Sequence, residues 1–271
     1  MRPVLFELGS LQVRSYGVVV ALAFVAAWVL LRKELERRSG RGDAAAPLVS
    51  AAGVGGLVGA RLYWFAEHAG DHQAPDLFSG AGFTWYGGVL GGALAVLGVV
   101  RITRVELSDL LGAGALALPL GYGLGRIACQ LAGDGTYGAP SDLPWAMSYP
   151  NGEVPTTQRV HPTPVYETLA SLAIFGLLWR FRRRAGPIQL FALYLLLAGL
   201  ERFLVEFIRI NDPVVAGLTQ PQLFAIGFMA AGALLAAWSR RTEAYTRGPD
   251  DSVPRRQLNL GDAARLAGGD D

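Results

Sequence analysis

Long apolar segments separated by short polar connections dominate this chain. A helix that crosses a bilayer needs about 20 mostly apolar residues, and seven segments approach that length, the third being the shortest of them. The expected spans are residues 16–31, 47–65, 86–100, 107–125, 164–179, 188–208 and 221–239. The pattern predicts an all-α integral membrane protein with seven transmembrane helices.

Basic residues gather in every second connection between these segments. They follow the first, third, fifth and seventh segments, in residues 32–41, 101–104, 180–184 and 240–241. The other connections contain few Arg or Lys residues. Because cytoplasmic loops carry an excess of Arg and Lys, we expect the N-terminus outside and the C-terminus in the cytoplasm.

The segments form a single membrane domain in this interpretation. It covers residues 1–241 and has an outer loop region near 127–163. Residues 242–271 are polar and interrupted by Gly and Pro, which predicts a disordered cytoplasmic tail. The N-terminal residues lack the features of a cleaved signal peptide, so the first span is expected to remain in the mature protein.

Composition agrees with a membrane protein and limits the partners. The chain is 52% hydrophobic and 17% charged, against about 25% charged residues in soluble domains. The net charge of +2 is too small to argue for a nucleic-acid partner. A lone cysteine, Cys129, excludes an internal disulfide. No residue set has metal-ligand spacing and no phosphate-binding Gly-rich loop precedes a lysine, so neither a metal nor a cofactor is expected.

Three charges lie in or directly after the sixth apolar segment. Arg202, Glu206 and Arg209 are separated by four and three residues, which places them on one face of a helix. A charge at the centre of a bilayer costs roughly 2.5–3.5 kcal/mol on insertion scales and usually serves a function. Arg61 and Arg126 fall in the outer half of other segments, so one outward-facing cavity could collect all five charges. One Glu cannot neutralise the surplus arginines, which favours an anionic ligand such as a phosphate. The alternative is a buried Arg–Glu pair that only locks helices together.

Other polar positions accompany these charges. Tyr86 and two glycines open the third segment, where interfacial aromatics are an equally simple interpretation. Asp134 follows Arg126 in a Gly-rich stretch, unless it belongs to a solvated surface loop. At the start of the fifth segment, His161 is either an acid–base group or a local hydrogen-bonding residue. Glu167, one turn further, needs a partner such as an arginine.

The order of these motifs resembles the prolipoprotein diacylglyceryl transferases of bacteria, over roughly residues 13–240. The similarity is carried by Tyr16-Gly17, Gly59-Ala60-Arg61, Tyr86-Gly87-Gly88, Gly125-Arg126 with the loop to Gly138, His161-Pro162 through Tyr166-Glu167, and Arg202-x3-Glu206-x2-Arg209. Members of this family are seven-span enzymes of the cytoplasmic (inner) membrane. They transfer the diacylglyceryl group of phosphatidylglycerol to the lipobox cysteine of a prolipoprotein and release glycerol 1-phosphate.

The resemblance implies roles for particular residues. Arg126 and Arg202 would contact the lipid phosphate, Tyr16, Glu206 and Arg209 would support that site, and Asp134 stands where the family has Glu. The catalytic candidates are Arg126, Arg202, Asp134, Glu206 and Tyr86. The substrate-binding candidates are Tyr16, Arg61, Gly87, Gly88, His161, Glu167 and Arg209. The implied partners are phosphatidylglycerol, membrane lipid and a prolipoprotein signal peptide.

Three further positions depart from the family pattern. Tyr86 replaces the His of a His-Gly-Gly motif, Cys129 replaces an Asn, and Ala198 replaces a Tyr one turn before Arg202. The group that accepts the thiol proton therefore stays open among Asp134, Glu206, His161 and Tyr86. Two other functions also stay open. One is a paralogue that binds anionic phospholipid but uses another acceptor or has no catalysis, and the other is an anion transporter.

Overall fold

The computed structural model describes residues 1–9, 11–67 and 84–246. The chain divides into two compact units, Met1–Ala236 and Ala237–Asp271. Of the second unit, the described residues are 237–246, which end the last helix. Residues 68–83, in the connection after the second predicted segment, and the predicted tail beyond residue 246 lie outside the described residues.

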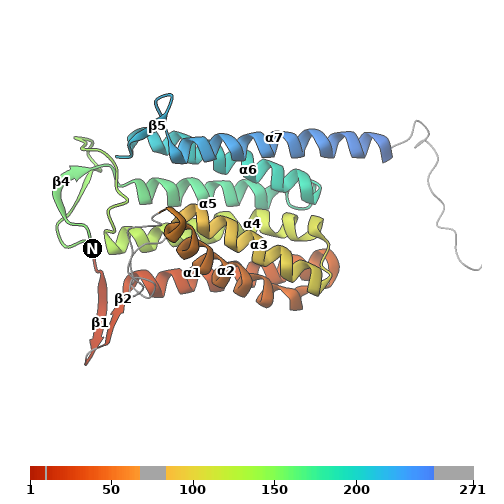
Figure 1. Cartoon of the computed structure of the whole chain (residues 1–271), viewed down its shortest axis with the longest axis horizontal. Coiled ribbons are helices and arrows are strands. Elements are labelled where there is room, and N and C mark those ends of the chain that lie inside the picture. The colour runs from red at the N-terminus through yellow and green to blue at the C-terminus, as the bar shows by residue number, and fades with distance from the viewer. Residues whose placement is uncertain (10, 68–83, 247–271) are drawn as a thin grey trace, which may run out of the picture. The chain divides into compact units, whose positions relative to one another are not determined.

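Helices make up most of the described structure (Figure 1). Their bounds are Ser15–Ser39 (α1), Ala45–Glu67 (α2), Trp85–Thr103 (α3), Leu107–Ala132 (α4), Thr163–Phe181 (α5), Pro187–Val205 (α6) and Gln220–Thr246 (α7). Within the described residues, six helices are long and apolar enough to cross a membrane, and α5 is not among these six. The chain is therefore a predominantly helical, multi-pass membrane protein.

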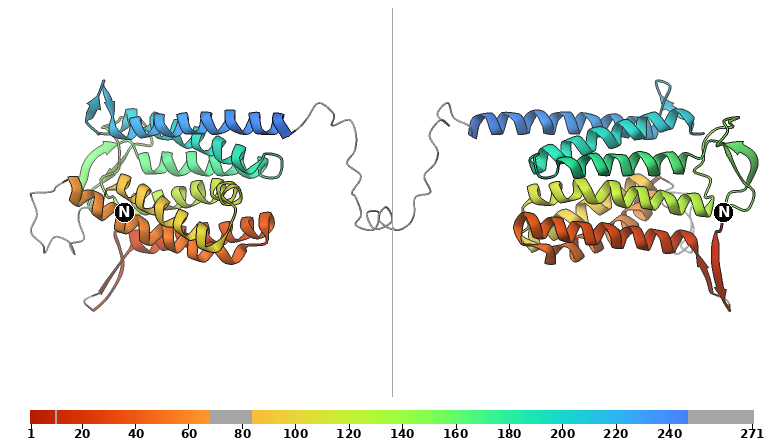
Figure 2. Two further views of the ribbon diagram at one scale, coloured as in Figure 1. Left: turned by 45° about the vertical axis from the view of Figure 1, so that its right-hand side comes forward. Right: turned by 180° about the vertical axis from the view of Figure 1, so that it is seen from behind.

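Short strands interrupt the expected all-α pattern. They form three antiparallel pairs: Val4–Leu8 with Leu11–Arg14 (β1–β2), Met147–Tyr149 with Thr156–Val160 (β3–β4), and Pro213–Val215 with Leu218–Thr219 (β5–β6). Both views in Figure 2 keep β1–β2 and β3–β4 at the same end of the helices. Hairpins satisfy the backbone hydrogen bonds of these connections, and strands of two to five residues are too short for hydropathy to reveal.

Some helices continue beyond the predicted apolar segments. α1 includes the basic residues up to Ser39, because charged residues such as Arg, Lys and Glu are good helix formers outside the lipid. α4 continues through Arg126 to Ala132 and ends at Gly133, which has a φ of +63°. The outer loop region expected from about residue 127 therefore begins at Gly133. α7 extends to Thr246, five residues into the segment expected as a tail.

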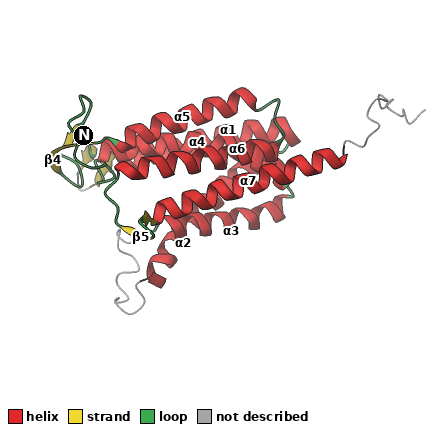
Figure 3. Ribbon diagram, turned by 90° about the horizontal axis from the view of Figure 1, so that it is seen from above, coloured by secondary structure: helices red, strands yellow, loops and turns green. Residues whose placement is uncertain are grey.

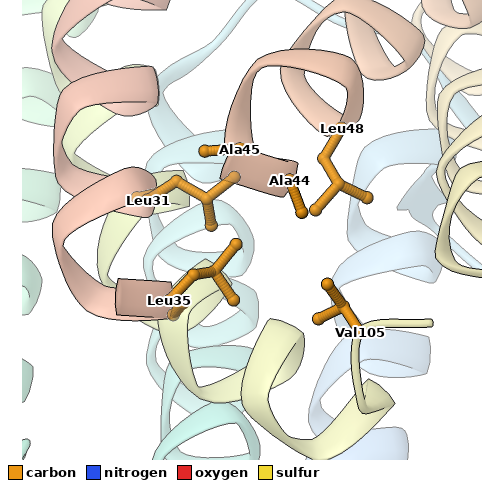
Figure 4. Close-up of a cluster of buried hydrophobic side chains, with 8 residues drawn as sticks. Leu31, Leu35, Ala44, Ala45, Leu48 and Val105 are labelled. Carbon is orange, nitrogen blue, oxygen red and sulfur yellow. The ribbon is translucent and has the colours of Figure 1, made fainter. Parts of the chain in front are cut away.

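Two groups of helices pack within the first unit. α4 contacts α1, α5 and α6, and α2 pairs closely with α3. Figure 3 shows α2 and α3 together on one side of the other helices of this unit. One apolar cluster, drawn in Figure 4, joins the end of α1 to the start of α2 through Leu31, Leu35, Ala45 and Leu48. Large apolar side chains on the outer helix faces, such as Leu57 and Leu94, are exposed, as expected for contact with lipid.

Glycines bring α2 and α3 into backbone contact. A Cβ atom added at Gly91 of α3 would lie 2.3 Å from the carbonyl oxygen of Gly55 in α2. A Cβ at Gly87 would lie 2.3 Å from the carbonyl oxygen of Gly59. Small residues at such positions let membrane helices approach closely, which allows the van der Waals contact that drives their association.

Replacement of Gly91 by alanine should therefore destabilise the protein by about 1–3 kcal/mol, because the added methyl group overpacks the α2–α3 contact. Gly98 on the same helix provides the matched control, since a Cβ atom added there would meet no other helix or side chain within 4 Å. Gly98→Ala should leave stability within about 1 kcal/mol of the parent chain. Thermal unfolding in detergent measures both, and equal midpoints for the two variants would contradict the packing argument.

Candidate active site

A carboxylate with no solvent exposure lies at the centre of the predicted site. Glu167 is in the second turn of α5, and its side chain is 0% exposed. Its Oε1 atom accepts hydrogen bonds from the Tyr122 hydroxyl at 2.9 Å and from Arg202 Nη1 at 3.0 Å. Its Oε2 atom accepts from Arg126 Nη2 and lies 3.9 Å from Arg209 Nη1. The arginine partner expected for Glu167 is thus present three times.

Glu206 is the second buried carboxylate of this cluster. It begins a 3-10 turn, Glu206–Ile208, that directly follows α6. Its Oε2 atom accepts from Arg202 Nη2 at 2.7 Å and lies 3.8 Å from Arg209 Nε. Its Oε1 atom accepts from the Thr219 hydroxyl at 2.9 Å and from Asn211 Nδ2 at 2.5 Å. The spacing of the three charges in the sixth segment does bring them together.

The cluster has more cations than anions. Three guanidinium groups, of Arg126, Arg202 and Arg209, face the carboxylates of Glu167 and Glu206. If these five groups are ionised, they carry one net positive charge, and no ion pair of the described residues joins them to Glu201, the neighbouring carboxyl group on α6. The Nε atoms of Arg126 and Arg209 are also buried without a hydrogen-bond partner among the described residues. Such a cluster can accept an anion, and the planar guanidinium group suits phosphate oxygens.

The loop between α4 and α5 is fixed to the end of α6. The carbonyl oxygen of Thr136 accepts from Arg209 Nη1 at 3.0 Å and from the Thr163 hydroxyl at 2.5 Å. The Ala139 amide donates to the Ile208 carbonyl at 2.8 Å. A Cβ atom at Gly138 would lie 2.3 Å from that same carbonyl oxygen, so this contact requires glycine.

Tyr149 holds the other part of this loop against α4. Its side chain is buried, its hydroxyl donates to Gln130 Oε1 at 3.0 Å, and its ring stacks on Tyr137 with a centroid distance of 5.0 Å. Burial raises the pKa of the Tyr149 phenol, which therefore remains neutral and keeps donating this hydrogen bond at physiological pH.

A cavity of about 340 Å³ opens beside the charge cluster. Its lining comes from α3, α4, α5, α6 and α7 and from the loop at Thr136. The polar lining residues are Tyr86, Tyr122, Arg126, Thr136, Ser171, Tyr194, Glu201, Arg202 and Arg209. The apolar ones are Pro119, Ile174, Ala198, Pro221, Phe224, Ala225 and Phe228.

The polarity of the cavity changes along its length. On α4 the lining runs from Arg126 to Pro119, and on α6 from Arg202 to Tyr194. Seven or eight residues of helix correspond to roughly 10–12 Å at 1.5 Å per residue. On both helices the arginine is nearer the end where β3–β4 lies. The cavity thus has a cationic end at the hairpins and a more apolar end towards the middle of the helices.

Six of the candidate residues belong neither to the charge cluster nor to the cavity lining: Tyr16, Arg61, Gly87, Gly88, Asp134 and His161. Three of these six residues contact side chains or amides close to them in the sequence. Asp134 Oδ1 accepts from the Thr136 amide at 3.2 Å and from its hydroxyl at 2.7 Å. His161 Nδ1 is 3.4 Å from the Tyr166 hydroxyl. The guanidinium carbon of Arg61 lies 5.2 Å from the Trp64 ring centroid.

The departures from the family pattern have distinct positions. Tyr86 lines the cavity and stacks on Phe224 at a centroid distance of 4.1 Å. Ala198 also lines it, and its small side chain leaves room there. Cys129 is buried, and its Sγ accepts from Arg126 Nη1 at 3.4 Å. The lone thiol is therefore a neighbour of the charge cluster and not a cavity-lining residue.

Sequence reasoning missed three ionisable residues of the cavity: Tyr122, Tyr194 and Glu201. The two tyrosines resemble ordinary aromatic residues of apolar segments, and only the fold shows that they face the cavity. Glu201 carried a usable signal, because a fourth charged residue beside Arg202, Glu206 and Arg209 is as costly in a membrane segment as they are. Its position beside Arg202 in the sequence hid that signal, because two oppositely charged neighbours resemble an ion pair, whereas the ion pairs of Arg202 in the described structure are with Glu167 and Glu206.

Comparison with known proteins places these features in context. Residues 3–238 match the family model for prolipoprotein diacylglyceryl transferases. Three similar proteins carry the name phosphatidylglycerol–prolipoprotein diacylglyceryl transferase, and each is 33% identical to this chain. The Clostridium tetani protein aligns over 79% of this chain and 87% of its own length. The Chromohalobacter salexigens protein aligns over 88% and 92%, and the Methylococcus capsulatus protein over 89% and 97%.

The Glu167 carboxylate should be essential for stability. In Glu167→Gln the arginines lose their fully buried counter-charge, so the free energy of unfolding should fall by about 3–5 kcal/mol. The matched control is Glu153→Gln, which makes the same chemical change in a solvent-exposed pair with Arg14 and should cost less than about 1 kcal/mol. Thermal or denaturant unfolding in detergent distinguishes them, and a Glu167→Gln variant as stable as Glu153→Gln would refute the assignment.

Proposed function

Because the chain belongs to the prolipoprotein diacylglyceryl transferase family, we propose that it transfers the diacylglyceryl group of phosphatidylglycerol to a cysteine thiol of a prolipoprotein. The observation that carries this proposal is the surplus of guanidinium groups at one end of a cavity whose other end is mainly apolar. A phospholipid has the same division, with an anionic head group joined to apolar chains.

The proposed binding mode follows this polarity. The phosphate of phosphatidylglycerol lies at Arg126 and Arg202, in the cluster where three guanidinium groups face two ion-paired carboxylates. Glu167 holds both arginines in place, and Glu206, which also contacts Arg209, holds Arg202. The glycerol backbone extends towards the apolar lining formed by residues such as Ile174 and Phe228.

The reaction is a substitution at the glycerol carbon that carries the phosphate ester. The acceptor thiol loses its proton, its sulfur forms a bond to this carbon, and the carbon–oxygen bond to phosphate breaks with its electron pair on oxygen. Glycerol 1-phosphate leaves with one more negative charge than the lipid phosphate had. Arg126 and Arg202 stabilise that developing charge in a site largely shielded from water.

The orientation in the membrane is also part of this proposal. Basic residues end α1, α3 and α5, and these ends lie opposite the hairpins. The positive-inside rule then assigns them to the cytoplasm and the arginine cluster to the outer half of the bacterial inner membrane. In this topology α5 also crosses the membrane and brings the number of proposed spans to seven. The charge of its Glu167 is compensated by arginines.

The remaining candidate residues would shape the surroundings of the substrate. Gly87 and Gly88 keep α3 against α2 and so place Tyr86 at the cavity. Asp134 and His161 belong to the loop that carries Thr136 to Arg209. The prolipoprotein signal peptide, which must bring its thiol to this cavity, is the second proposed partner.

A transfer assay tests the function and the phosphate site together. The chain is expressed in bacteria depleted of their own transferase, and a lipobox peptide is analysed by mass spectrometry for an added diacylglyceryl group. The parent chain should modify the peptide. Arg126→Ala and Arg202→Ala should each lower the rate by at least about 100-fold, because each removes a charge that stabilises the leaving phosphate.

The control for both variants is Arg101→Ala, which removes an exposed arginine at the end of α3 and should leave the rate unchanged. Membrane insertion of every variant is checked by fractionation. A well-inserted parent chain that modifies no peptide would refute the transferase and favour a lipid-binding paralogue. An active Arg126→Ala, Arg202→Ala double variant would refute the phosphate site alone.

A further inference from the structure

Glu201 is a carboxyl group of the cavity with no assigned task. It lies on α6 and contributes to the cavity lining next to Arg202. Its Oε1 atom is buried and has no hydrogen-bond partner among the described residues. No ion pair of the described structure includes it, although three arginines lie on the same cavity wall or beside it. A buried polar atom without a partner is costly, which points to a group that meets its partner in a ligand.

The other carboxylates near the cavity already have their full set of partners. Glu167 accepts from Tyr122, Arg126 and Arg202. Glu206 accepts from Arg202, Asn211 and Thr219. Protonation of either would break ion pairs that hold α5 and α6 in place. Neither is therefore suited to accept a proton during turnover.

The remaining candidates for the proton acceptor are no better placed. Asp134 is engaged with Thr136, and His161 lies beside Tyr166, and neither lines the cavity. Tyr86 does line it, but a phenol ionises near pH 10 and is neutral and weakly basic at physiological pH. Glu201 is the carboxyl group that combines a cavity position with a free acceptor atom.

We propose that Glu201 accepts the proton of the prolipoprotein thiol, an inference that rests on the proposed transferase function. The S–H proton moves to the Glu201 carboxylate as sulfur bonds to the glycerol carbon and the carbon–oxygen bond to phosphate breaks. The proton then passes from Glu201 to the departing glycerol phosphate, whose monoester dianion accepts it with a pKa near 6. This transfer restores the carboxylate for the next turnover, and atoms and charges balance.

The position of Glu201 fits this task physically. It directly precedes Arg202, so a thiol within reach of Glu201 is near the arginine that binds the phosphate. Helical geometry places Tyr194, two turns earlier, on the same face.

Replacement of Glu201 by glutamine separates proton transfer from hydrogen bonding. The amide has nearly the same shape and still donates and accepts hydrogen bonds, but it cannot take up the thiol proton. In phosphatidylglycerol nanodiscs with a lipobox peptide at about pH 7, Glu201→Gln should lower kcat by about 100- to 10,000-fold. The KM for the lipid should stay within about threefold. Glu201→Asp, which keeps a carboxylate, should recover a large part of the rate.

The pH dependence provides a readout that a purely structural role would not change. Since a free cysteine thiol ionises near pH 8.5, the Glu201→Gln rate should rise about tenfold per pH unit below that value, whereas the parent rate should level off once the Glu201 carboxyl group is ionised. Glu106→Gln, at an exposed site before α4, is the control and should match the parent chain.

Each outcome decides a specific claim. A Glu201→Gln rate within about threefold of an active parent chain overturns the role of Glu201 and leaves the transferase function intact. A loss that neither higher pH nor Glu201→Asp restores overturns it as well, since it marks a structural residue. A parent chain that transfers nothing in this assay overturns the transferase function and the inference together.

Discussion

The compensation of charge around Glu167 is the constraint on which the rest of this structure depends. A carboxylate with no solvent exposure inside a membrane protein must be met by cations, and here three arginines from two helices and the adjoining turn meet it. Arg126 fixes α4 to α5, and Arg202 and Arg209 fix α5 to the end of α6. The same contacts leave one positive charge unmatched, so the stabilising network and the proposed phosphate site are a single set of residues.

The surrounding fold encloses this network and the cavity beside it. The loop from Gly133 to Val160 closes the hairpin end through the Thr136–Arg209 and Ala139–Ile208 hydrogen bonds. The glycine contacts of α2 and α3 support the helix that presents Tyr86 to the cavity. The cavity between these parts is polar where arginines are required and apolar further inward. That division suits a phospholipid better than a small soluble anion, for which an apolar half would have no use.

The sequence allowed some of these features to be predicted because their signals are local. Apolar segments of about 20 residues mark membrane helices, and the spacing of Arg202, Glu206 and Arg209 places them together on one face. An arginine partner for Glu167 could be expected from the sequence. Which arginines supply it could not, because that depends on how α4, α5 and α6 pack. The end of α4 was placed too early, because Gly125 resembles a helix end and the signal at Gly133 depends on its backbone conformation. Glu201 was overlooked because its two notable features, a place in the cavity lining and a buried oxygen without a hydrogen-bond partner among the described residues, depend on the fold.

Native mass spectrometry of lipid retention tests the central claim most directly. The purified chain is released from nanodiscs that contain equal amounts of phosphatidylglycerol and zwitterionic phosphatidylcholine, and the lipids that remain bound are identified. A cluster with one unmatched positive charge should retain the anionic lipid in at least about tenfold excess, which corresponds to about 1.4 kcal/mol of preference. Equal retention of the two lipids would contradict the account, because the arginines would then serve only to hold the helices together.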